Sequence, residues 1–391
     1  MITKFKIVGF KSIESAELEL GNVNVFIGAN GGGKSNLLEA LGIIAAAAFG
    51  RVDQESLVRR GCRPGGLFRP MFRDNSPDGE TVLETSGGGI SYQVSLSSPP
   101  PRRPMGWEYK KELWVSAGQD LVNRPHPEEA TKGDPQAGLA ALKLAQMDIA
   151  DPAAIFLKTL AGYSIYSPDT PVMRGLIQDP QLREPVGLSG GRLAQAAAEM
   201  MSDPNANTKL LAEFRSSFEW FEAFFSVSTS KGPERSAAGQ LLVFLDKFCL
   251  GSKDHARYFF TADEVNEGAL YLLLVAVVCL HPIAPKLFAL DNADHGLNPV
   301  LAKRLMGTMC RWLLEANRER QVLMTTHNPL VLDGLPLQDD RVRLFIVDRD
   351  NSGATRVKRF IVTAEHRTKA AEGWTLSRMW VNGLIGGVPN V

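Results

Sequence analysis

The sequence predicts an α/β fold with a mixed-sheet core that is assembled from the two ends of the chain. Near the N-terminus, the apolar strand VNVFI leads into a glycine-rich turn and then into the helix-forming segment SNLLEALGIIAAAAF. Towards the C-terminus, a nearly all-apolar helix at 268–281 precedes the strand LFALD, a helix from about 299 to 317 and the strand QVLMTT. Such strand–helix alternation is typical of a sheet covered by helices.

The middle of the chain has a different character. Residues 51–125 contain strand-like stretches separated by Gly, Asp and Pro, which predicts an antiparallel β lobe. Residues 126–257 favour a mainly helical insert, interrupted by the strand-like YSIYSP at 163–168. We therefore expect one domain over 1–391, with its core formed by 1–50 and 258–391. The segments RLFIVDRD and TRVKRFIVT flank DNSGA and predict a terminal hairpin, and no heptad run is long enough for a long coiled coil.

Composition places limits on the class of protein. The 391 residues are enough for a sizeable core, and the 43 basic side chains cancel the 43 acidic ones. Net charge therefore does not indicate nucleic acid as a partner, although a local basic face is left open. The four cysteines show no metal-ligand spacing, no signal-peptide core is present, and the longest apolar run, 272–280, is too short for a bilayer. We expect a cytoplasmic protein without a membrane partner.

The turn at 28–35, GANGGGKS, matches the Walker A pattern GxxxxGK[ST] between a strand and a helix. Gly28 and Gly33 let the backbone wrap closely around a phosphate, while successive N–H groups and the helix N-terminus point at the anion. Lys34 is expected to reach the β- and γ-phosphates of ATP, and the Ser35 hydroxyl to ligate Mg²⁺. The candidate nucleotide-binding residues of this segment are Gly28, Asn30, Gly31, Gly32, Gly33, Lys34, Ser35 and Asn36.

Two further strands end in polar residues. The strand LFALD ends at Asp291, which we expect to be the magnesium carboxylate of a Walker B motif, together with Ser35. About thirty residues later, VLMTTHNP places His327 directly after another hydrophobic strand. By contrast, DRD at 348–350 is followed by NSG, ordinary turn chemistry, so no nuclease site is expected in this chain.

With these motifs, the chain resembles the ABC-type ATPases of the RecF/SMC/OLD-like group. The resemblance rests on FIGANGGGKSNLLEAL around the glycine-rich turn and on FKSI upstream of it. It implies an ABC-ATPase head, which is a P-loop NTPase fold, with ATP and Mg²⁺ as ligands. It also implies that the segment before the turn lies near the nucleotide base, which makes Lys11 and Ser12 candidate contacts.

Two segments compete for the signature motif of these ATPases, which in a head-to-tail dimer covers the partner's ATP. GLSGGRLAQ at 187–195 has the right letters, but Leu188 lies about 100 residues upstream of Asp291. VNEG at 265–268 has the expected distance, so we favour it, with Asn266 and Gly268 as candidate nucleotide contacts. The other interpretation of LSGG is a small-residue turn that caps a helix through Ser189.

The stretch 291–299 is similar to the DEPExGLHP run of OLD-like and RecF-like relatives. Asn292 stands where these have the catalytic Glu, and Asp294 stands at the second acidic position. The resemblance makes 296–299 the D-loop at the dimer interface and His327 the switch histidine that senses the γ-phosphate. We expect slow hydrolysis, in which Asp294 orients water in place of Asn292. The Q-loop cannot be located from the sequence.

Together these features predict an ATP-binding, slowly hydrolysing switch that forms a homodimer or higher homo-oligomer. We expect it to control a separate effector, a nuclease or toxin, and family analogy points to anti-phage defence, as in PARIS-like or OLD-like systems, or to DNA maintenance. Asn292 motivates one alternative, a non-hydrolysing ATP-bound scaffold or sensor. Another is a RecF-like DNA-binding repair ATPase, for which the arginines within 59–73 form a candidate phosphate-binding strip.

Overall fold

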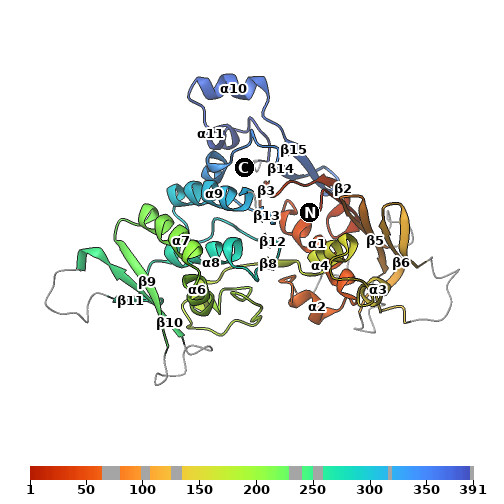
Figure 1. Cartoon of the computed structure of the whole chain (residues 1–391). Helices are drawn as coiled ribbons and strands as arrows, with labels where there is room; N and C mark the ends of the chain where they lie inside the picture. Colours follow the sequence, from red (N-terminus) through yellow and green to blue (C-terminus); the bar gives the residue numbers. More distant parts are fainter. Residues whose placement is uncertain are drawn as a thin grey trace.

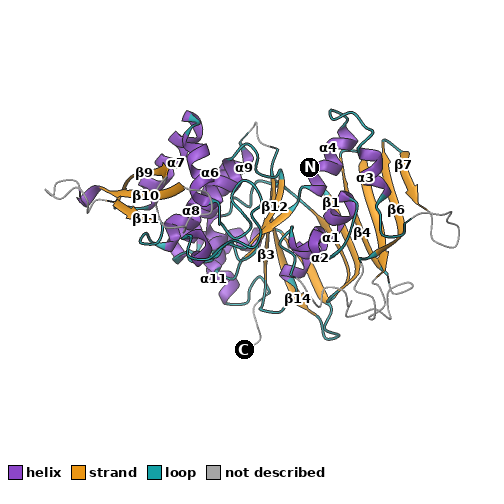
Figure 2. Ribbon diagram, turned by 90° about the horizontal axis from the view of Figure 1, so that it is seen from below, coloured by secondary structure: helices purple, strands orange, loops and turns teal. Residues whose placement is uncertain are grey.

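The computed structural model describes most of the chain, namely residues 1–63, 80–97, 106–124, 134–228, 240–249, 259–315 and 319–387. Within these ranges the strands form three sheets, and the central sheet lies between a β lobe and a helical part (Figures 1 and 2). Of the arginine strip expected within 59–73, Arg59, Arg60 and Arg63 are among the described residues, whereas Arg69 and Arg73 are not.

The central sheet is mixed, as the sequence predicts, and has the strand order β15-β14-β3-β13-β12-β8. Five strands run parallel, and β15 pairs antiparallel with β14 as the expected terminal hairpin. The strands are β3 (Val23–Ile27), β8 (Ser164–Tyr166), β12 (Leu287–Leu290), β13 (Gln321–Thr325), β14 (Val342–Arg349) and β15 (Thr355–Phe360). Chain segments from both ends and from the middle thus meet in one sheet.

Helices cover both faces of this sheet. Successive strand residues point to opposite sides, so the apolar strands expose side chains on both faces that the helices bury. Val25 and Ile27 of β3 belong to the core shared with α8 and α9, whereas Phe26 belongs to the core shared with α1 and the β lobe. These helices are α1 (Lys34–Phe49), α8 (Glu267–Leu280) and α9 (Pro299–Leu314). Both cores are therefore anchored on the strand that precedes the glycine-rich turn.

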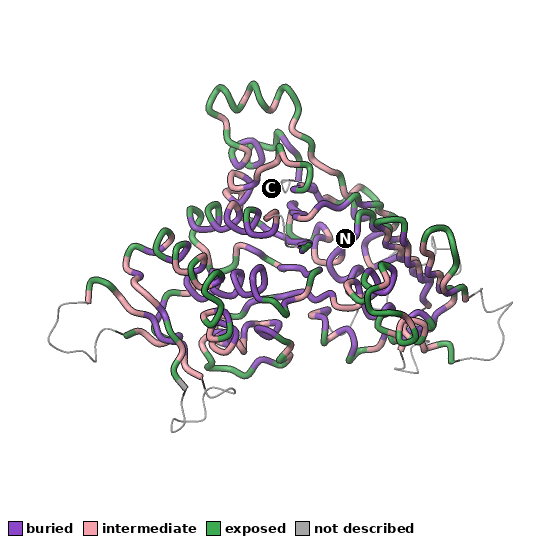
Figure 3. The backbone as a smooth tube through the Cα atoms, in the orientation of Figure 1, coloured by how far each residue is buried: buried purple, intermediate pink, exposed green. Residues whose placement is uncertain are grey.

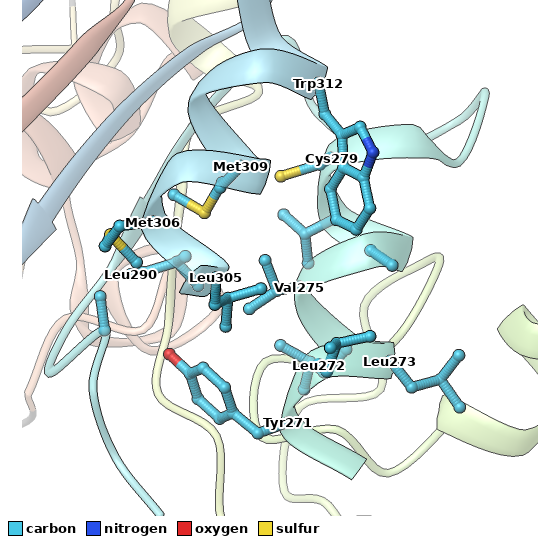
Figure 4. Close-up of a cluster of buried hydrophobic side chains, with 14 of the residues drawn as sticks. Tyr271, Leu272, Leu273, Val275, Cys279, Leu290, Leu305, Met306, Met309 and Trp312 are labelled. Atoms are coloured by element: carbon cyan, nitrogen blue, oxygen red, sulfur yellow. The ribbon is translucent and has the colours of Figure 1, made fainter. Parts of the chain in front are cut away.

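Helix α8 is apolar on all sides because neighbours surround it. Every residue from Gly268 to Leu280 is buried, and the tube view shows this helix enclosed (Figure 3). One side of α8 packs against α9 and the central sheet, where Val275 lies among Leu305, Met309 and Leu290 (Figure 4). Contacts with α6 (Leu193–Met201) and α7 (Pro204–Ser217) cover another side. Burial of this kind fixes where the N-terminus of α8 emerges.

The β lobe is an antiparallel sheet with the order β2-β1-β4-β5-β6-β7. Its first two strands come from residues 1–50, which the sequence analysis assigned to the nucleotide-binding core. The β lobe therefore includes more of the chain than the expected range of 51–125. The cause is pairing between β1 and β4, with Ile7 opposite Leu83, which buries both side chains beside α1. The strands are β1 (Lys4–Phe10), β2 (Ile13–Glu19), β4 (Thr81–Gly87), β5 (Ile90–Ser97), β6 (Glu108–Ser116) and β7 (Gln119–Arg124).

The segment expected to be mainly helical also contains strands. One of them, β8, joins the central sheet, and two others, β9 and β10, form a small antiparallel sheet with β11 in which β10 is the central strand. Aromatic side chains drive this arrangement, since Phe214 of α7 contacts Phe221, Phe224 and Phe244 of the sheet with ring centroids 4.9–6.3 Å apart. The strands are β9 (Phe221–Ser228), β10 (Gln240–Asp246) and β11 (Phe259–Thr261).

The remaining helices are short and lie around these layers. They are α2 (Gln54–Val58), α3 (Leu139–Leu144), α4 (Pro152–Ala161), α5 (Thr170–Met173), α10 (Ala364–Ala371) and α11 (Leu376–Val381). Helix α10 has no buried residue and projects from the molecule (Figure 3). In the described part of the chain, no helix has the length and apolar character needed to cross a membrane.

Candidate functional site

The glycine-rich turn links β3 to α1, and its glycines are required by close packing against the β14–β15 hairpin. Gly28 has φ 148°, and a Cβ there would lie 2.0 Å from the Val347 carbonyl oxygen. Gly33 has φ 110°, and its Cβ would lie 2.2 Å from Thr355 Oγ1. Both conformations disfavour any residue with a side chain. The turn is therefore held in shape by the C-terminal hairpin.

Lys34 lies at the start of α1 with its ammonium group turned onto the loop. Its Nζ donates to the carbonyl oxygens of Gly28 at 2.8 Å and Ala29 at 2.9 Å. Burial lowers the pKa of Lys34 to about 8, and the nearby carboxylates of Asp291, Asp294 and Asp348 oppose this shift only partly. A phosphate group bound in the loop would provide a negatively charged partner for this ammonium group and so stabilise its protonated form.

Ser35 and Asp291 come together at the carboxyl edge of the central sheet. The Ser35 hydroxyl lies 3.1 Å from each oxygen of the Asp291 carboxylate. On the other side, Thr325 at the end of β13 donates its hydroxyl to Asp291 Oδ1 at 2.6 Å. A hydroxyl and a carboxylate are the hard oxygen ligands that Mg²⁺ prefers, usually one or two from the protein with phosphates and water completing the shell. The pair therefore fits the expected metal.

Asn292 follows Asp291 in the left-handed region of the backbone, with φ 56°. Its N–H donates to Thr325 Oγ1 at 2.8 Å, so the same hydroxyl holds both residues, and its side chain is exposed. Asparagine adopts this conformation several times more readily than most residues with a side chain. The backbone at this position thus favours asparagine over the glutamate that the resemblance leads one to expect.

Asp294 and His327 lie next to each other at the same edge. The His327 N–H lies 3.4 Å from Asp294 Oδ1, which is a weak hydrogen bond, and the His327 side chain is partly desolvated. Burial, aided by the positive charge of Lys34, lowers the pKa of His327 below its usual range. The imidazole is therefore neutral at pH 7 and able to share a hydrogen bond with a phosphate oxygen.

A second group of polar residues borders the loop on the side of β1 and β2. Lys11 forms an ion pair with Glu39 of α1, and Arg63 Nε donates to the same carboxylate at 2.6 Å. Sequence reasoning missed Glu39 and considered Arg63 only as part of the candidate phosphate-binding strip. Glu39 lies four residues after Ser35, hence on the same face of α1, and is charged within an otherwise apolar helix, which was the available signal.

Ser12 lies beside the loop but is buried, and its hydroxyl already has partners. It is 2.8 Å from Thr355 Oγ1 and accepts a hydrogen bond from Asn36 Nδ2 at 2.8 Å. Thr355 in turn donates to the Gly32 carbonyl at 2.9 Å. Ser12 and Asn36 therefore support the loop, and their direct contact with a nucleotide stays a prediction, as it does for Lys11.

The VNEG segment forms the N-terminus of α8. Asn266 is the N-cap, and its Oδ1 accepts the Ala269 N–H at 2.9 Å. Its side chain is exposed, so the amide Nδ2 is left to donate outward. The next residue, Glu267, accepts a hydrogen bond from Thr170 and lies 3.6 Å from His295 Nε2. A buried helix thus presents its N-terminal turn at the surface beside the segment after β12.

The LSGG segment is engaged internally. The buried Asp179 carboxylate accepts the N–H groups of Ser189 at 3.1 Å and Gly191 at 3.0 Å. Helix α6 begins at Leu193 after the N-cap Arg192 with no side-chain cap, so the expected capping by Ser189 is wrong. The reason is that the turn at 187–192 places Ser189 too far ahead of the helix. With these N–H groups bonded to Asp179, the segment is a structural turn.

The structure locates a segment beside Asp291 that the sequence left unassigned. Because β8 is the parallel neighbour of β12, the Asp291 N–H donates to the Tyr166 carbonyl at 3.0 Å. Residues 167–170 follow directly and reach Glu267 through Thr170. This loop joins the edge of the central sheet to the N-terminus of α8.

Two family models match the chain. One, described as "AAA domain, putative AbiEii toxin, Type IV TA system", matches residues 189–333, which include Asp291 and His327. The other, described as "AAA ATPase domain", matches residues 1–77, which include the glycine-rich turn.

Related proteins and a solved structure were also found. The DNA replication and repair protein RecF of Renibacterium salmoninarum is 45% identical over 136 residues, 34% of this chain and 32% of that protein. RecF of Porphyromonas gingivalis is 34% identical over 84 residues, 21% of this chain and 23% of that protein. The alignments thus span less than a third of these relatives.

Among solved structures, an SMC head bound to the C-winged helix domain of ScpA has a TM-score of 0.50 at 15% identity, covering 92% of this chain and 98% of that one. At this identity the likeness concerns the fold alone, and it confirms the expected head-type α/β architecture.

Proposed function

We propose that this chain, an ABC-type ATPase of the RecF/SMC-like group, is a switch whose dimerisation is controlled by binding and slow hydrolysis of ATP. ATP would bind on the turn at 28–35, with Lys34 at its β- and γ-phosphates. The Ser35 hydroxyl and the Asp291 carboxylate would hold Mg²⁺, which when bound neutralises charge on the phosphates.

The observation that carries this proposal is the meeting of Ser35 and Asp291. They are separated by 256 residues in the sequence, yet the hydroxyl lies 3.1 Å from both carboxylate oxygens, beside a glycine-rich loop that is packed against the β14–β15 hairpin. Lys34 borders the same place with a buried ammonium group. Hydroxyl, carboxylate and ammonium at one loop are the groups that phosphoryl transfer requires.

Asn266 supports the dimer part of the proposal. The N-terminus of α8 carries a partial positive charge, and the exposed amide of Asn266 is free to donate. In a head-to-tail dimer these groups would approach the γ-phosphate held by the partner's loop. ATP would then complete the interface, and hydrolysis would release it.

Slow hydrolysis follows from the residues at the end of β12. Asn292 cannot accept a proton, but Asp294 beside His327 offers a carboxylate that could orient water. Steady-state phosphate release, measured on the purified protein, tests the proposal. We expect slow release that requires Mg²⁺ and is abolished by Lys34→Ala. If ATP binds tightly while phosphate release equals that of Lys34→Ala, the alternative of a non-hydrolysing scaffold is correct.

Dimerisation is tested separately by sedimentation of the Asp294→Ala variant, which should keep ATP binding but slow hydrolysis, with and without ATP. We expect ATP to produce a dimer, and Asn266→Ala to weaken it while leaving ATP binding to the monomer unchanged. A monomer at every ATP concentration would refute the sandwich model. Arg367→Gln on the exposed helix α10 is a suitable control, because it lies outside both candidate contact regions.

The RecF relatives favour one second candidate, a DNA-binding repair ATPase. Retention on double-stranded DNA that falls steeply with salt would support it, since phosphate contacts release counterions. The description of the matching family model instead points to a toxin–antitoxin role, in keeping with the expected control of a nuclease or toxin. Capture of such an effector only in the presence of ATP would favour that role over DNA repair.

A further inference from the structure

A cavity lies at the end of α1 that is remote from the glycine-rich turn. Its volume is about 500 Å³, within the range of small-molecule sites. Helix α1 runs from Lys34 to Phe49, so the cavity lies about 22 Å along the helix axis from the loop. Four arginines line it, together with Phe49 and Leu182: Arg51, Arg59, Arg60 and Arg183.

Two of these arginines have no carboxylate partner among the described residues. The cavity's two carboxylates are already paired, Asp53 with Arg51 and Glu55 with Arg59. Four arginines less these two acids leave a net lining charge of two positive units, carried by Arg60 and Arg183.

Both unpaired guanidinium groups are held in place by backbone carbonyls. Arg60, 4% exposed, donates to the Ser56 oxygen at 2.7 Å and the Ala161 oxygen at 3.0 Å, while its buried Nε has no partner. Arg183 donates to the Gly162 oxygen at 2.7 Å. Carbonyl groups fix the positions of these cations but do not neutralise them.

The electrostatics of the pair favour an anion. Burial lowers the pKa of Arg60 to about 10, and the positive charges of Arg183 and Arg59 lower it as well. Burial also lowers the pKa of Arg183. A buried charge without a partner is costly. An anion in the cavity would offset that cost, and guanidinium groups suit phosphate in particular, because they offer parallel donors.

The rim of the cavity is apolar and open. Phe49 is 62% exposed at the end of a helix that is otherwise buried from Leu37 to Ala48, and Leu182 is 45% exposed. The guanidinium group of Arg60 lies over the Phe49 ring, with Cζ 5.1 Å from the ring centroid. A flat apolar group could therefore stack on Phe49 while an attached phosphate reaches the arginines.

We propose that this cavity is a binding site for a small phosphorylated ligand of nucleotide size, separate from the glycine-rich turn. The phosphate would lie between Arg60 and Arg183, and the base or another flat group would lie against Phe49 and Leu182. Such a ligand would contact the same helix that carries Lys34 and Ser35 at its other end.

The test uses the full chain with Lys34→Ala, so that the glycine-rich turn does not contribute. Titration calorimetry with AMP and with inorganic phosphate is compared across variants. We expect both to bind, and AMP more tightly. Arg183→Gln should weaken both by about tenfold or more, and Phe49→Ala should weaken AMP alone. Arg367→Gln, a control of the same charge change on α10, should alter neither.

Several results would overturn the proposal. One is no binding of AMP or phosphate at millimolar concentration, and another is equal binding with and without Arg183→Gln. Binding of single-stranded oligonucleotides without binding of AMP would assign the arginines to nucleic acid instead. If Arg183→Gln does not fold, Phe49→Ala provides the test, because the exposed Phe49 side chain can be removed without disturbing the core. An equal loss of AMP and phosphate affinity, or no loss of either, would contradict the assigned geometry.

Discussion

Removal of the Thr325 hydroxyl is expected to loosen the end of β12 and to weaken magnesium-dependent nucleotide binding. This hydroxyl donates to Asp291 Oδ1 at 2.6 Å and accepts the Asn292 N–H at 2.8 Å, and Thr325 is 1% exposed. Thr325→Val keeps the shape of the side chain but deletes both bonds. A hydrogen bond to a charged group contributes about 1.5–3 kcal/mol. The lost bond from the Asn292 N–H costs less, because water can partly replace the hydroxyl at this exposed residue.

We therefore expect Thr325→Val to lower the free energy of unfolding by about 2–3 kcal/mol. The neighbouring Thr326 provides the control, since it is 0% exposed and its hydroxyl accepts one hydrogen bond, from the Asn328 N–H at 3.1 Å. Thr326→Val should lower the free energy of unfolding by only about 1 kcal/mol, the contribution of one neutral hydrogen bond. Urea denaturation of the two variants measures the difference.

Binding separates the specific role of Thr325 from its part in stability. In Thr325→Val the Asp291 carboxylate is no longer held in position, so we expect ATP affinity in the presence of Mg²⁺ to fall about tenfold, equal to about 1.4 kcal/mol. With EDTA in place of Mg²⁺, Thr325→Val should bind ATP as tightly as the parent protein. Equal losses of stability in the two variants, or an unchanged magnesium dependence, would refute this reasoning.

Three other predictions follow from the loop and its neighbours. Gly33→Ala should abolish ATP binding and lower the melting temperature, because its Cβ would meet Thr355 at 2.2 Å; Gly31→Ala, with φ 75° and nothing within 4 Å, should show only the backbone cost of about 1–2 kcal/mol. Similar melting temperatures for the two variants would contradict this. ATP affinity should fall by up to about tenfold per pH unit above pH 8, because the free protein then loses the Lys34 proton, at a pKa of about 8, whereas the complex keeps it. An equal Kd at pH 7 and pH 9.5 would exclude this linkage. Asp294→Ala should slow phosphate release with ATP binding intact, and turnover at the parental rate would show that Asp294 does not compensate for Asn292.

Local motifs carried most of the prediction of the candidate site. Glycines at 28 and 33 are needed wherever a backbone passes this close to other atoms, and a lysine and serine after them mark the start of a helix at a phosphate. Asp291 and His327 each follow a buried strand. The ends of parallel strands meet at one edge, so the sequence could predict that these residues lie together even though they are far apart along the chain.

Residues that act through long-range packing were not predictable in the same way. Arg63 reaches Glu39 only because the chain after α2 returns to α1, and no local pattern records that return. The spacing of LSGG already argued against a signature role, but only the fold shows that its N–H groups are bonded to Asp179. Asn292 looked like a lost glutamate, but its left-handed backbone supplies a local reason for asparagine.

The sequence by itself determined the class of fold and the loop chemistry, because strand periodicity, glycine conformation and helix-forming composition are local properties. Only the tertiary structure decided that β1 and β2 pair with the β lobe, that β8 becomes the neighbour of β12, and that β9 and β10 form a sheet. Strand pairing depends on partners distant in sequence and on which apolar faces can be buried together. The same reason applies to the arginine cavity, since Arg60 and Arg183 acquire a shared environment only when α1, α2 and α4 have packed.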